Sequence, residues 1–180
     1  MLTPLLTTKL HFPPLRGGLV GRPRLFDRLK QGLGRPLTLI SAPAGSGKTT
    51  LMSAWRAEPG RDFPAAWLSL DTGENDPRHF LTYLTAALET LQQGITADTR
   101  LLLGSPQQEP VEYLLTSLIN DLANFPADFA LVLDDYHVLT SPAMREAMTF
   151  LLEHQPHQMH LVILTFQIPY GDSEYTKKTL

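Results

Sequence analysis

Four short apolar runs dominate the pattern of hydrophobic and polar positions along the chain. They cover residues 37–40, 65–70, 129–133 and 161–164, and each is rich in Leu, Ile, Val or Ala. Continuous apolar runs of this length are typical of strands that are buried on both faces of a sheet. The pattern therefore predicts four buried strands.

Between these runs, apolar residues recur at intervals of three and four, which predicts amphipathic helices. Two of the helices have clear start signals, because Asn75-Asp76-Pro77 and Ser141-Pro142 each place a capping side chain before a proline. The pattern weakens over residues 94–110, where we expect a loop with at most a short helical piece at residues 100–103. The predicted helices cover residues 24–30, 49–56, 77–91, 111–124 and 142–154.

From the first predicted strand onward, the order of the predicted elements is β-α-β-α-α-β-α-β. Strands that alternate with helices favour a mostly parallel sheet, because parallel neighbours need crossover connections and the crossover helices cover the sheet. We therefore expect an α/β fold with three layers. The chain divides into an extended arm at residues 1–19, one domain at residues 20–165, and a tail at residues 166–180 that we expect to be disordered.

Composition and charge narrow the classes of function. The 180 residues are 43% hydrophobic and 18% charged, which is typical of a globular protein, and the net charge is −3. This charge gives no indication of a sequence-independent nucleic-acid binder, since such proteins carry an excess of Lys and Arg. The absence of cysteine excludes a disulfide scaffold, a thiolate zinc site and a cysteine nucleophile.

The sequence contains neither a clear membrane span nor a clear signal peptide. No apolar run approaches the roughly 20 residues that are needed to cross a bilayer. Residues 1–10 contain polar threonines and Lys9 in place of the apolar stretch of a signal peptide. We therefore expect a cytoplasmic protein that does not contact a membrane.

The segment Ala42–Thr49, Ala-Pro-Ala-Gly-Ser-Gly-Lys-Thr, lies between the first predicted strand and a predicted helix. It fits the phosphate-loop (Walker A) pattern G-x-x-x-x-G-K-[ST] at every fixed position except the first, where Ala42 replaces glycine. The flanking strand and helix are the context that the pattern requires. We interpret the segment as a candidate phosphate loop, and the fold as a P-loop NTPase sandwich. A chance glycine-rich turn is the alternative.

The residue types of the candidate phosphate loop suit a nucleotide, ATP or ADP, together with Mg²⁺. Gly45 and Gly47 let successive backbone N–H groups turn inward around a phosphate, next to the positive N-terminal end of the following helix. Lys48 would neutralise the β- and γ-phosphates, and the Thr49 hydroxyl would bind Mg²⁺. The predicted nucleotide-binding residues are Arg22, Ala44, Gly45, Ser46, Gly47, Lys48, Thr49 and Thr50.

Asp134 and Asp135, the acidic pair, directly follow the predicted strand at residues 129–133. Ligands of parallel sheets bind at the carboxyl ends of the strands, so we expect the acidic pair beside the candidate phosphate loop. In this Walker B position we predict that Asp134 serves the metal with Thr49 and that Asp135 polarises the attacking water. A turn or a helix cap is the alternative, because aspartates are common in both.

Two further residues could approach a nucleotide. Arg22 belongs to a segment, residues 19–22, that could cover the adenine and ribose and bring the guanidinium toward the phosphates. A solvated surface arginine is the alternative. His137 lies two residues after the acidic pair, where it could face the terminal phosphate or point from a loop into solvent.

Three histidines, His154, His157 and His160, have the spacing of metal ligands. Pro156 interrupts this segment, so the three side chains cannot share one face of a helix. We therefore expect a surface loop here and no metal site.

Several separated motifs follow one another in a fixed order along residues 3–165. They are residues 8–10, 19–29, 37–50, 66–71, 75–76, 80–87, 131–137 and 150–156. Together they resemble the N-terminal ATPase domain of MalT-like, LuxR-type transcriptional activators, which are STAND signalling ATPases related to AAA+ proteins. The run Leu-Val-Leu-Asp-Asp-Tyr-His at residues 131–137, after Ser-Ala-Pro-Ala-Gly-x-Gly-Lys-Thr-Thr, is the most specific part of the resemblance.

This resemblance implies a nucleotide switch. ADP would hold a resting state, an inducer would permit exchange for ATP, the ATP form would self-associate, and hydrolysis would reset the switch. By the same resemblance, Lys48 and Thr49 bind the phosphates and Mg²⁺, Asp134 serves the metal, and Asp135 activates water. The family binds DNA through a helix-turn-helix that these 180 residues do not contain.

The chain departs from the family pattern in two ways. It ends at residue 180, so we expect a fragment whose sheet lacks its last strand. Phe166 stands where the family has an arginine that senses the γ-phosphate, so we expect hydrolysis to be slow at most. A frameshift or truncation near codon 166 would explain both departures. This hypothesis fails if neither of the other two reading frames continues the family pattern.

The prediction is thus an ATP- and ADP-binding domain with at most weak ATPase activity. Its expected partners are nucleotide, copies of itself and full-length relatives. One alternative is a non-catalytic nucleotide-binding or interaction remnant, which could pair through an exposed sheet edge or fold poorly. Another is a small-molecule P-loop kinase, which would need an arginine-bearing lid. Residues 94–110 contain only Arg100, which argues against a kinase.

Overall fold

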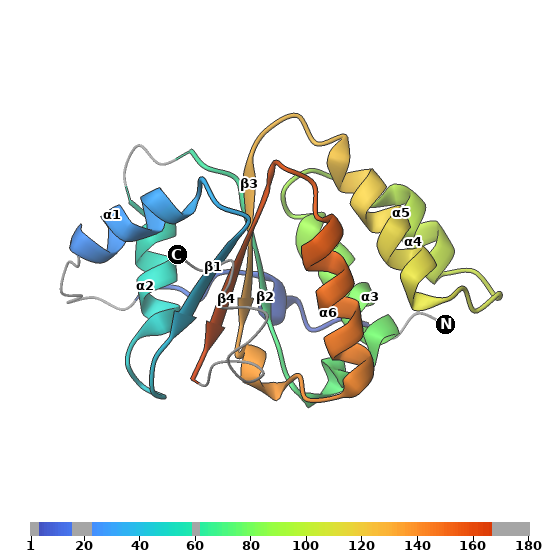
Figure 1. Cartoon of the computed structure of the whole chain (residues 1–180), viewed down its shortest axis with the longest axis horizontal. Helices are drawn as coiled ribbons and strands as arrows, with labels where there is room; N and C mark the ends of the chain where they lie inside the picture. The colour runs from blue at the N-terminus through green and yellow to red at the C-terminus, as the bar shows by residue number, and fades with distance from the viewer. Residues whose placement is uncertain (1–3, 16–22, 59–61, 167–180) are drawn as a thin grey trace.

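In the computed structural model, which describes residues 4–15, 23–58 and 62–166, the chain folds as an α/β sandwich (Figure 1). All four predicted strands form, and they make one parallel sheet in the order β1-β4-β3-β2. The predicted α/β fold class is therefore confirmed. The strands are β1 (Leu37–Ser41), β2 (Ala65–Ser69), β3 (Phe129–Asp134) and β4 (Met159–Thr165).

Helices cover both faces of the sheet. Helices α1 and α2 lie on one face, α3, α5 and α6 lie on the other, and α4 packs against α5 (Figure 1). Within the described ranges, none of these helices is long and apolar enough to span a bilayer. Their bounds are α1 (Pro23–Gly32), α2 (Lys48–Arg56), α3 (Pro77–Leu88), α4 (Ala97–Leu103), α5 (Val111–Ala123) and α6 (Pro142–His154).

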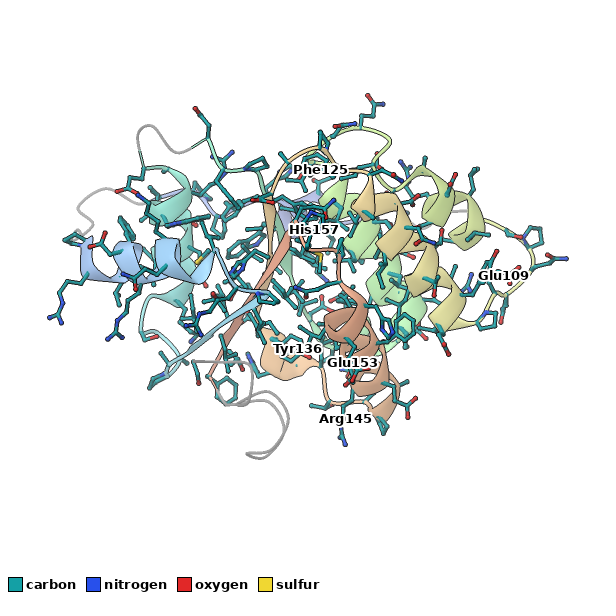
Figure 2. All side chains as sticks on the ribbon, turned by 45° about the horizontal axis from the view of Figure 1, so that its top comes forward. Glu109, Phe125, Tyr136, Arg145, Glu153 and His157 are labelled. Carbon is teal, nitrogen blue, oxygen red and sulfur yellow. The ribbon has the colours of Figure 1, made fainter. Side chains whose placement is uncertain are left out.

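Strand β3 illustrates how one sheet builds two hydrophobic cores. Successive side chains of a strand point to opposite faces. Leu131 and Leu133 pack with residues of α3, α5 and α6, whereas Val132 packs with Trp55 and Trp67 on the side of α1 and α2. Every residue of β3 is buried, which explains the unbroken apolar run in the sequence. Figure 2 shows side chains filling the space between the sheet and its helices.

The strand order decides which loops meet. Strand β4 lies between β1 and β3, so the strands that precede the candidate phosphate loop and the acidic pair are not direct neighbours. The register pairs Ser41 at the end of β1 with Thr165 at the end of β4. Tyr136, which follows β3, and His157, which precedes β4, lie at opposite ends of the sheet (Figure 2). All strands therefore direct their carboxyl ends to the same edge.

The two predicted helix starts are confirmed. The Asp76 carboxylate accepts a hydrogen bond from the backbone N–H of His79 at 2.8 Å, and Pro77 occupies the first turn of α3. The Ser141 hydroxyl accepts from the N–H of Met144 at 3.1 Å at the start of α6. Each cap satisfies a backbone donor that the first turn of a helix leaves free.

The predicted N-terminal arm, described at residues 4–15, contains one turn of 3₁₀-helix, η1 (Thr7–Leu10), that packs against β2. Leu10 is buried, and the ring centroids of Phe12 and Trp67 are 4.8 Å apart. Apolar contacts therefore hold the arm along β2, which is the last strand in the sheet order. The proline-rich sequence predicts an extended arm and gives no sign of this turn.

Helix α4 begins at Ala97, three residues before the short helical piece that the sequence predicts. The Glu89 carboxylate accepts hydrogen bonds from the N–H groups of Gly94 at 2.8 Å and Thr96 at 2.9 Å, and from the Thr96 hydroxyl at 2.6 Å. Burial opposes the ionisation of Glu89, but the bonds from Thr96 and Gly94 outweigh it and lower its pKa. These contacts fix the turn from which α4 starts.

The prediction of a surface loop for the three histidines is wrong for His160. This residue lies in β4 and is only 3% exposed. Its Nε2 is 3.0 Å from the Thr38 hydroxyl, and its Nδ1 donates to the carbonyl of Arg35. Burial lowers the pKa of His160. His154 and His157 are exposed, and no group of three potential metal ligands occurs in the described part of the chain.

Candidate functional site

The candidate phosphate loop and the acidic pair meet at the carboxyl edge of the sheet, which lies at the bottom of Figure 1. The loop leaves β1 at Ala42, whose N–H donates to the carbonyl of Thr165 in β4 at 3.2 Å. Asp134 ends β3, the strand on the other side of β4. Topology therefore brings two segments 85 positions apart in sequence to one place.

The loop has the backbone path that its glycines allow. Gly45 and Gly47 have φ values of 75° and 87°, in the left-handed region that side chains other than glycine rarely adopt. Gly47 is also the N-cap of α2, which begins at Lys48. Because glycine has no side chain to cap the helix, the first N–H groups of α2 remain available to an anion.

The Lys48 ammonium is held at the entrance of this turn. It donates to the carbonyls of Ala42 at 2.7 Å and Pro43 at 3.1 Å. Both acceptors belong to the candidate phosphate loop itself. The positive charge is therefore already positioned at the turn, where an anion would meet it together with the N–H groups of α2.

Thr49 and Asp134 make the closest side-chain contact between the two segments. The Thr49 hydroxyl donates to Oδ2 of Asp134 at 2.7 Å, and the N–H of Asp135 donates to Oδ1 at 2.9 Å. Asp134 is only 3% exposed. Burial is the main reason that the pKa of Asp134 is raised; the charge of Asp135 adds to this, and the Thr49 hydrogen bond opposes it. A hydroxyl and a carboxylate oxygen thus converge at the carboxyl edge.

Asp135 differs from its neighbour in exposure and in backbone conformation. Its side chain is 54% exposed, whereas Asp134 is buried. Its φ of 57° lies in the left-handed region, and it starts the 3₁₀-helical turn η3 (Tyr136–Val138). The two carboxylates therefore face different surroundings, one enclosed beside Thr49 and one open to water.

His137 and Phe166 lie at the same edge of the sheet, next to Asp135. The Nδ1 atom of His137 is 4.0 Å from Oδ1 of Asp135. The rings of His137 and Phe166 are in contact, with centroids 4.1 Å apart, and Phe166 is 42% exposed. His137 is thus packed between Asp135 and Phe166 and does not point freely into solvent, and its approach to a terminal phosphate stays a prediction.

The other residues predicted to bind nucleotide are Ala44, Ser46, Thr50 and Arg22. Ala44 and Thr50 are exposed at the loop and in the first turn of α2. The Ser46 hydroxyl is buried, and within the described residues it has no hydrogen-bond partner. Arg22 lies outside the described residues, so its approach to a nucleotide stays a prediction. The structure thus brings Lys48, Thr49 and the acidic pair together and leaves Thr50 at the margin.

A cavity of about 410 Å³ adjoins the loop between α1 and β1. Its lining combines apolar side chains of both elements with the polar groups of Ser46 and Lys48. This volume lies in the range of small-molecule sites. A larger cavity of about 750 Å³ lies between α3 and α4, away from the loop and the acidic pair.

Comparison with known proteins identifies the family. Residues 19–164 match the family described as AAA ATPase domain. The HTH-type transcriptional regulator MalT of Cronobacter sakazakii (strain ATCC BAA-894) is 38% identical over 165 residues, which cover 92% of this chain and 18% of that protein. The regulator of the same name from Yersinia pestis (strain Pestoides F) is 37% identical over 165 residues. The chain thus spans 18% of the length of these curated relatives.

Proposed function

This chain belongs to the AAA ATPase domain family, and we propose from that premise that it binds Mg-ATP and Mg-ADP at the candidate phosphate loop. We further propose that it hydrolyses ATP slowly, as the STAND-type nucleotide switch of a MalT-like, LuxR-type transcriptional regulator. The single observation that carries the proposal is the 2.7 Å contact between the Thr49 hydroxyl and the Asp134 carboxylate.

The residues of the loop suit the phosphates of a nucleotide. The left-handed glycines and the uncapped start of α2 provide backbone donors, and the Lys48 ammonium provides a charge. The buried Ser46 hydroxyl, unpartnered among the described residues, would gain an acceptor from a phosphate oxygen. In this proposal Lys48 exchanges its two loop carbonyls for the β- and γ-phosphate oxygens.

Thr49 and Asp134 would hold Mg²⁺. Both offer hard oxygen ligands, which this cation prefers, and they already lie within hydrogen-bond distance of one another. When bound, Mg²⁺ neutralises charge that develops on the β- and γ-phosphates. Asp134 would take part either directly or through a water. Its hydrogen bond from the Asp135 N–H fixes the orientation of the carboxylate.

Asp135 would orient and polarise the attacking water. Its carboxylate is open to solvent and sits one residue beyond the proposed metal ligand. Phosphoryl transfer is accelerated most by positive charge near the transferred group. Phe166 at the end of β4 supplies an aromatic ring where a cation would help. We therefore expect hydrolysis that is slow at most.

The wider role is inferred from the relatives. The proteins that match this chain are transcriptional regulators, and 18% of their length corresponds to it. We propose that nucleotide exchange in this domain would change self-association, or association with full-length relatives, and that DNA binding belongs to parts of such regulators outside these residues. The expected setting is the cytoplasm.

Thermal unfolding with and without Mg-ATP or Mg-ADP tests the proposal. A ligand that binds only the folded state stabilises it by about 2.7 kcal/mol at 100 times its Kd. We expect both nucleotides to raise the midpoint of the wild-type chain and to leave Lys48→Ala unchanged. Lys30→Ala is the matched control, because Lys30 is an exposed lysine of α1. The proposal fails if millimolar nucleotide does not shift the wild-type midpoint.

A further inference from the structure

One side chain, Asn75, ties the loop after β2 to the loop after the acidic pair. Its Oδ1 accepts from the N–H groups of Thr140 at 2.7 Å and Ser141 at 2.9 Å. Its Nδ2 donates to the carbonyls of Val138 at 2.7 Å and Thr72 at 3.3 Å. An amide offers two donors and two acceptor positions, and all four are used here.

The hydrogen bonds of Asn75 are connected to Asp135 through the backbone of Val138. Asn75 holds the carbonyl of Val138, and the N–H of Val138 donates to the carbonyl of Asp135 at 3.1 Å. The turn η3 between them starts from the left-handed conformation of Asp135. A residue other than glycine keeps such a conformation only where its surroundings fix it. Asn75 fixes the far end of this turn.

The segment that carries Asn75 is itself held by hydrogen bonds and by a buried neighbour. The Ser141 hydroxyl donates to the carbonyl of Asn75 at 2.8 Å. The preceding residue, Glu74, is fully buried; it accepts from the Asp71 N–H at 2.7 Å and from the Lys9 ammonium at 2.6 Å. The amide is therefore anchored from its own side as well, so it can transmit a defined position to the turn rather than follow it.

We propose that Asn75 is a positioning residue for ATP hydrolysis, which holds the turn that carries Asp135 so that the carboxylate meets the attacking water. The inference rests on the proposed function and adds a residue that the sequence marks as part of a helix start and of the family resemblance, without a role at the site. Asn75 has no contact with the candidate phosphate loop among its hydrogen bonds, so its effect falls on the rate of hydrolysis and not on nucleotide affinity.

Single-turnover hydrolysis of Mg-ATP and titration of nucleotide binding test this in the full chain. We expect Asn75→Ala to lower the hydrolysis rate per folded molecule at least about tenfold, because small displacements of a catalytic group are costly. The Kd for Mg-ATP should stay within about threefold, since the loop is untouched. Asn124→Ala is the matched control: Asn124 is exposed at the end of α5, and among the described residues its side-chain amide bonds only to the carbonyl of Asn120.

A double variant separates positioning from stability. If Asn75 acts through Asp135, then Asn75→Ala should add no further loss of rate in an Asp135→Asn background. If Asn75→Ala does not fold, Asn75→Asp replaces it, because it keeps the acceptor for Thr140 and Ser141 and loses the donor to Val138. We expect Asn75→Asp also to lower the rate of hydrolysis and to leave the Kd for Mg-ATP nearly unchanged.

Three results with the variants would overturn the inference. They are an unchanged rate in the folded Asn75 variants, equal losses of rate and affinity, and multiplicative losses in the double variant. A wild-type chain that binds Mg-ATP without any turnover also overturns it and leaves the proposed nucleotide binding intact. A wild-type chain that binds no nucleotide refutes the proposed function itself.

Discussion

At the scale of single residues, Asp134 places folding and the proposed metal binding in opposition. Burial is the main cause of its raised pKa. A folded-state pKa above the unfolded value means that this group stabilises the fold fully at pH values below the unfolded pKa, and that this contribution is lost as the pH rises through the folded pKa. Ionisation of Asp134 therefore lowers the free energy of unfolding of the nucleotide-free chain.

We expect Asp134→Asn to raise the thermal midpoint of the nucleotide-free chain at pH 7, because the amide is neutral and has nearly the same shape. The variant should also lose the extra stabilisation that Mg²⁺ adds to ATP, up to about 2.7 kcal/mol at 100 times Kd. Scanning calorimetry with ATP, with and without Mg²⁺, measures both effects. The exposed Asp128→Asn is the control. A midpoint of the nucleotide-free variant below that of the wild type would contradict the expected gain in stability. A Mg²⁺-dependent shift as large as that of the wild type would contradict the proposed role of Asp134 in holding the cation.

The buried imidazole of His160 makes the stability of the fold depend on pH. Its pKa is lowered by burial, so protonation favours the unfolded chain. Stability from this group is therefore full above the unfolded value of about 6.5 and is lost as the pH falls toward the folded pKa, by at most about 1.4 kcal/mol per pH unit. Urea unfolding at pH 7.5 and 5.5 should show this loss.

His160→Asn should remove most of that pH dependence, since an amide does not titrate and can still donate to the Arg35 carbonyl. His157→Asn should leave it unchanged, because His157 is exposed. Equal pH dependence in the wild type and in His160→Asn would show that other groups cause the loss. Because Pro156 breaks the helix, the sequence predicts a surface loop that extends to His160. The strand predicted at residues 161–164 begins two residues earlier, at Met159, so His160 is part of the buried strand.

At the scale of elements, the four strands and the five longer helices could be predicted to within a few residues at most boundaries. Their signals are local: unbroken apolar runs, helical spacing, and caps such as Asp76 and Ser141. The turn η1 and the start of α4 could not be predicted. Each depends on contacts from elsewhere in the chain, the first on Glu74 and Trp67 and the second on Glu89.

The turn η1 depends on Lys9, whose ammonium lies 2.6 Å from Glu74 and 3.1 Å from Asp71. Burial alone would lower the pKa of Lys9, but the hydrogen bonds to these carboxylates raise it overall. The Glu74 side chain is 0% exposed. We expect Lys9→Ala to lower the free energy of unfolding by about 3–5 kcal/mol, because it leaves a buried carboxylate without its main partner.

Urea unfolding checks this prediction, with the exposed Lys30→Ala as control. The double variant Lys9→Ala with Glu74→Gln should recover part of the loss, since the remaining buried group is neutral. If Lys9→Ala changes stability no more than Lys30→Ala does, the ion pair does not hold the arm. If the double variant loses more free energy of unfolding than the two single variants lose together, Glu74 has a role beyond this pair.

At the scale of the whole molecule, the fold class and the ATPase family could be predicted from the sequence, and the family match confirms the prediction. The motifs that carry the resemblance are short and continuous. The position of β4 between β1 and β3 could not be read from the chain, because strand order is a property of packing rather than of spacing. That order brings His137 and Phe166 into contact beside the acidic pair. Arg22 and residues 167–180 lie outside the described residues, so the role of Arg22 and the disorder of the tail stay predictions.

The contact of Thr49 with Asp134 joins α2 to the end of β3, so it links site and fold across the molecule. Thr49→Val keeps the shape but leaves the buried carboxylate without this donor. We expect the free energy of unfolding to fall by about 1–3 kcal/mol. The dependence of this energy on urea should keep its slope, because the surface buried by the sheet is the same.

Thr49→Ser retains the hydroxyl and serves as the control, with stability and nucleotide response close to those of the wild type. In the wild type and in Thr49→Ser, Mg-ATP should shift one cooperative transition as a whole, since the ligand would bridge segments of a single sheet. In Thr49→Val the shift by Mg-ATP should be no larger than the shift by ATP alone. A full Mg²⁺-dependent shift in Thr49→Val would mean that the cation is held elsewhere. The convergence of Thr49 and Asp134 would then serve the fold and not the nucleotide.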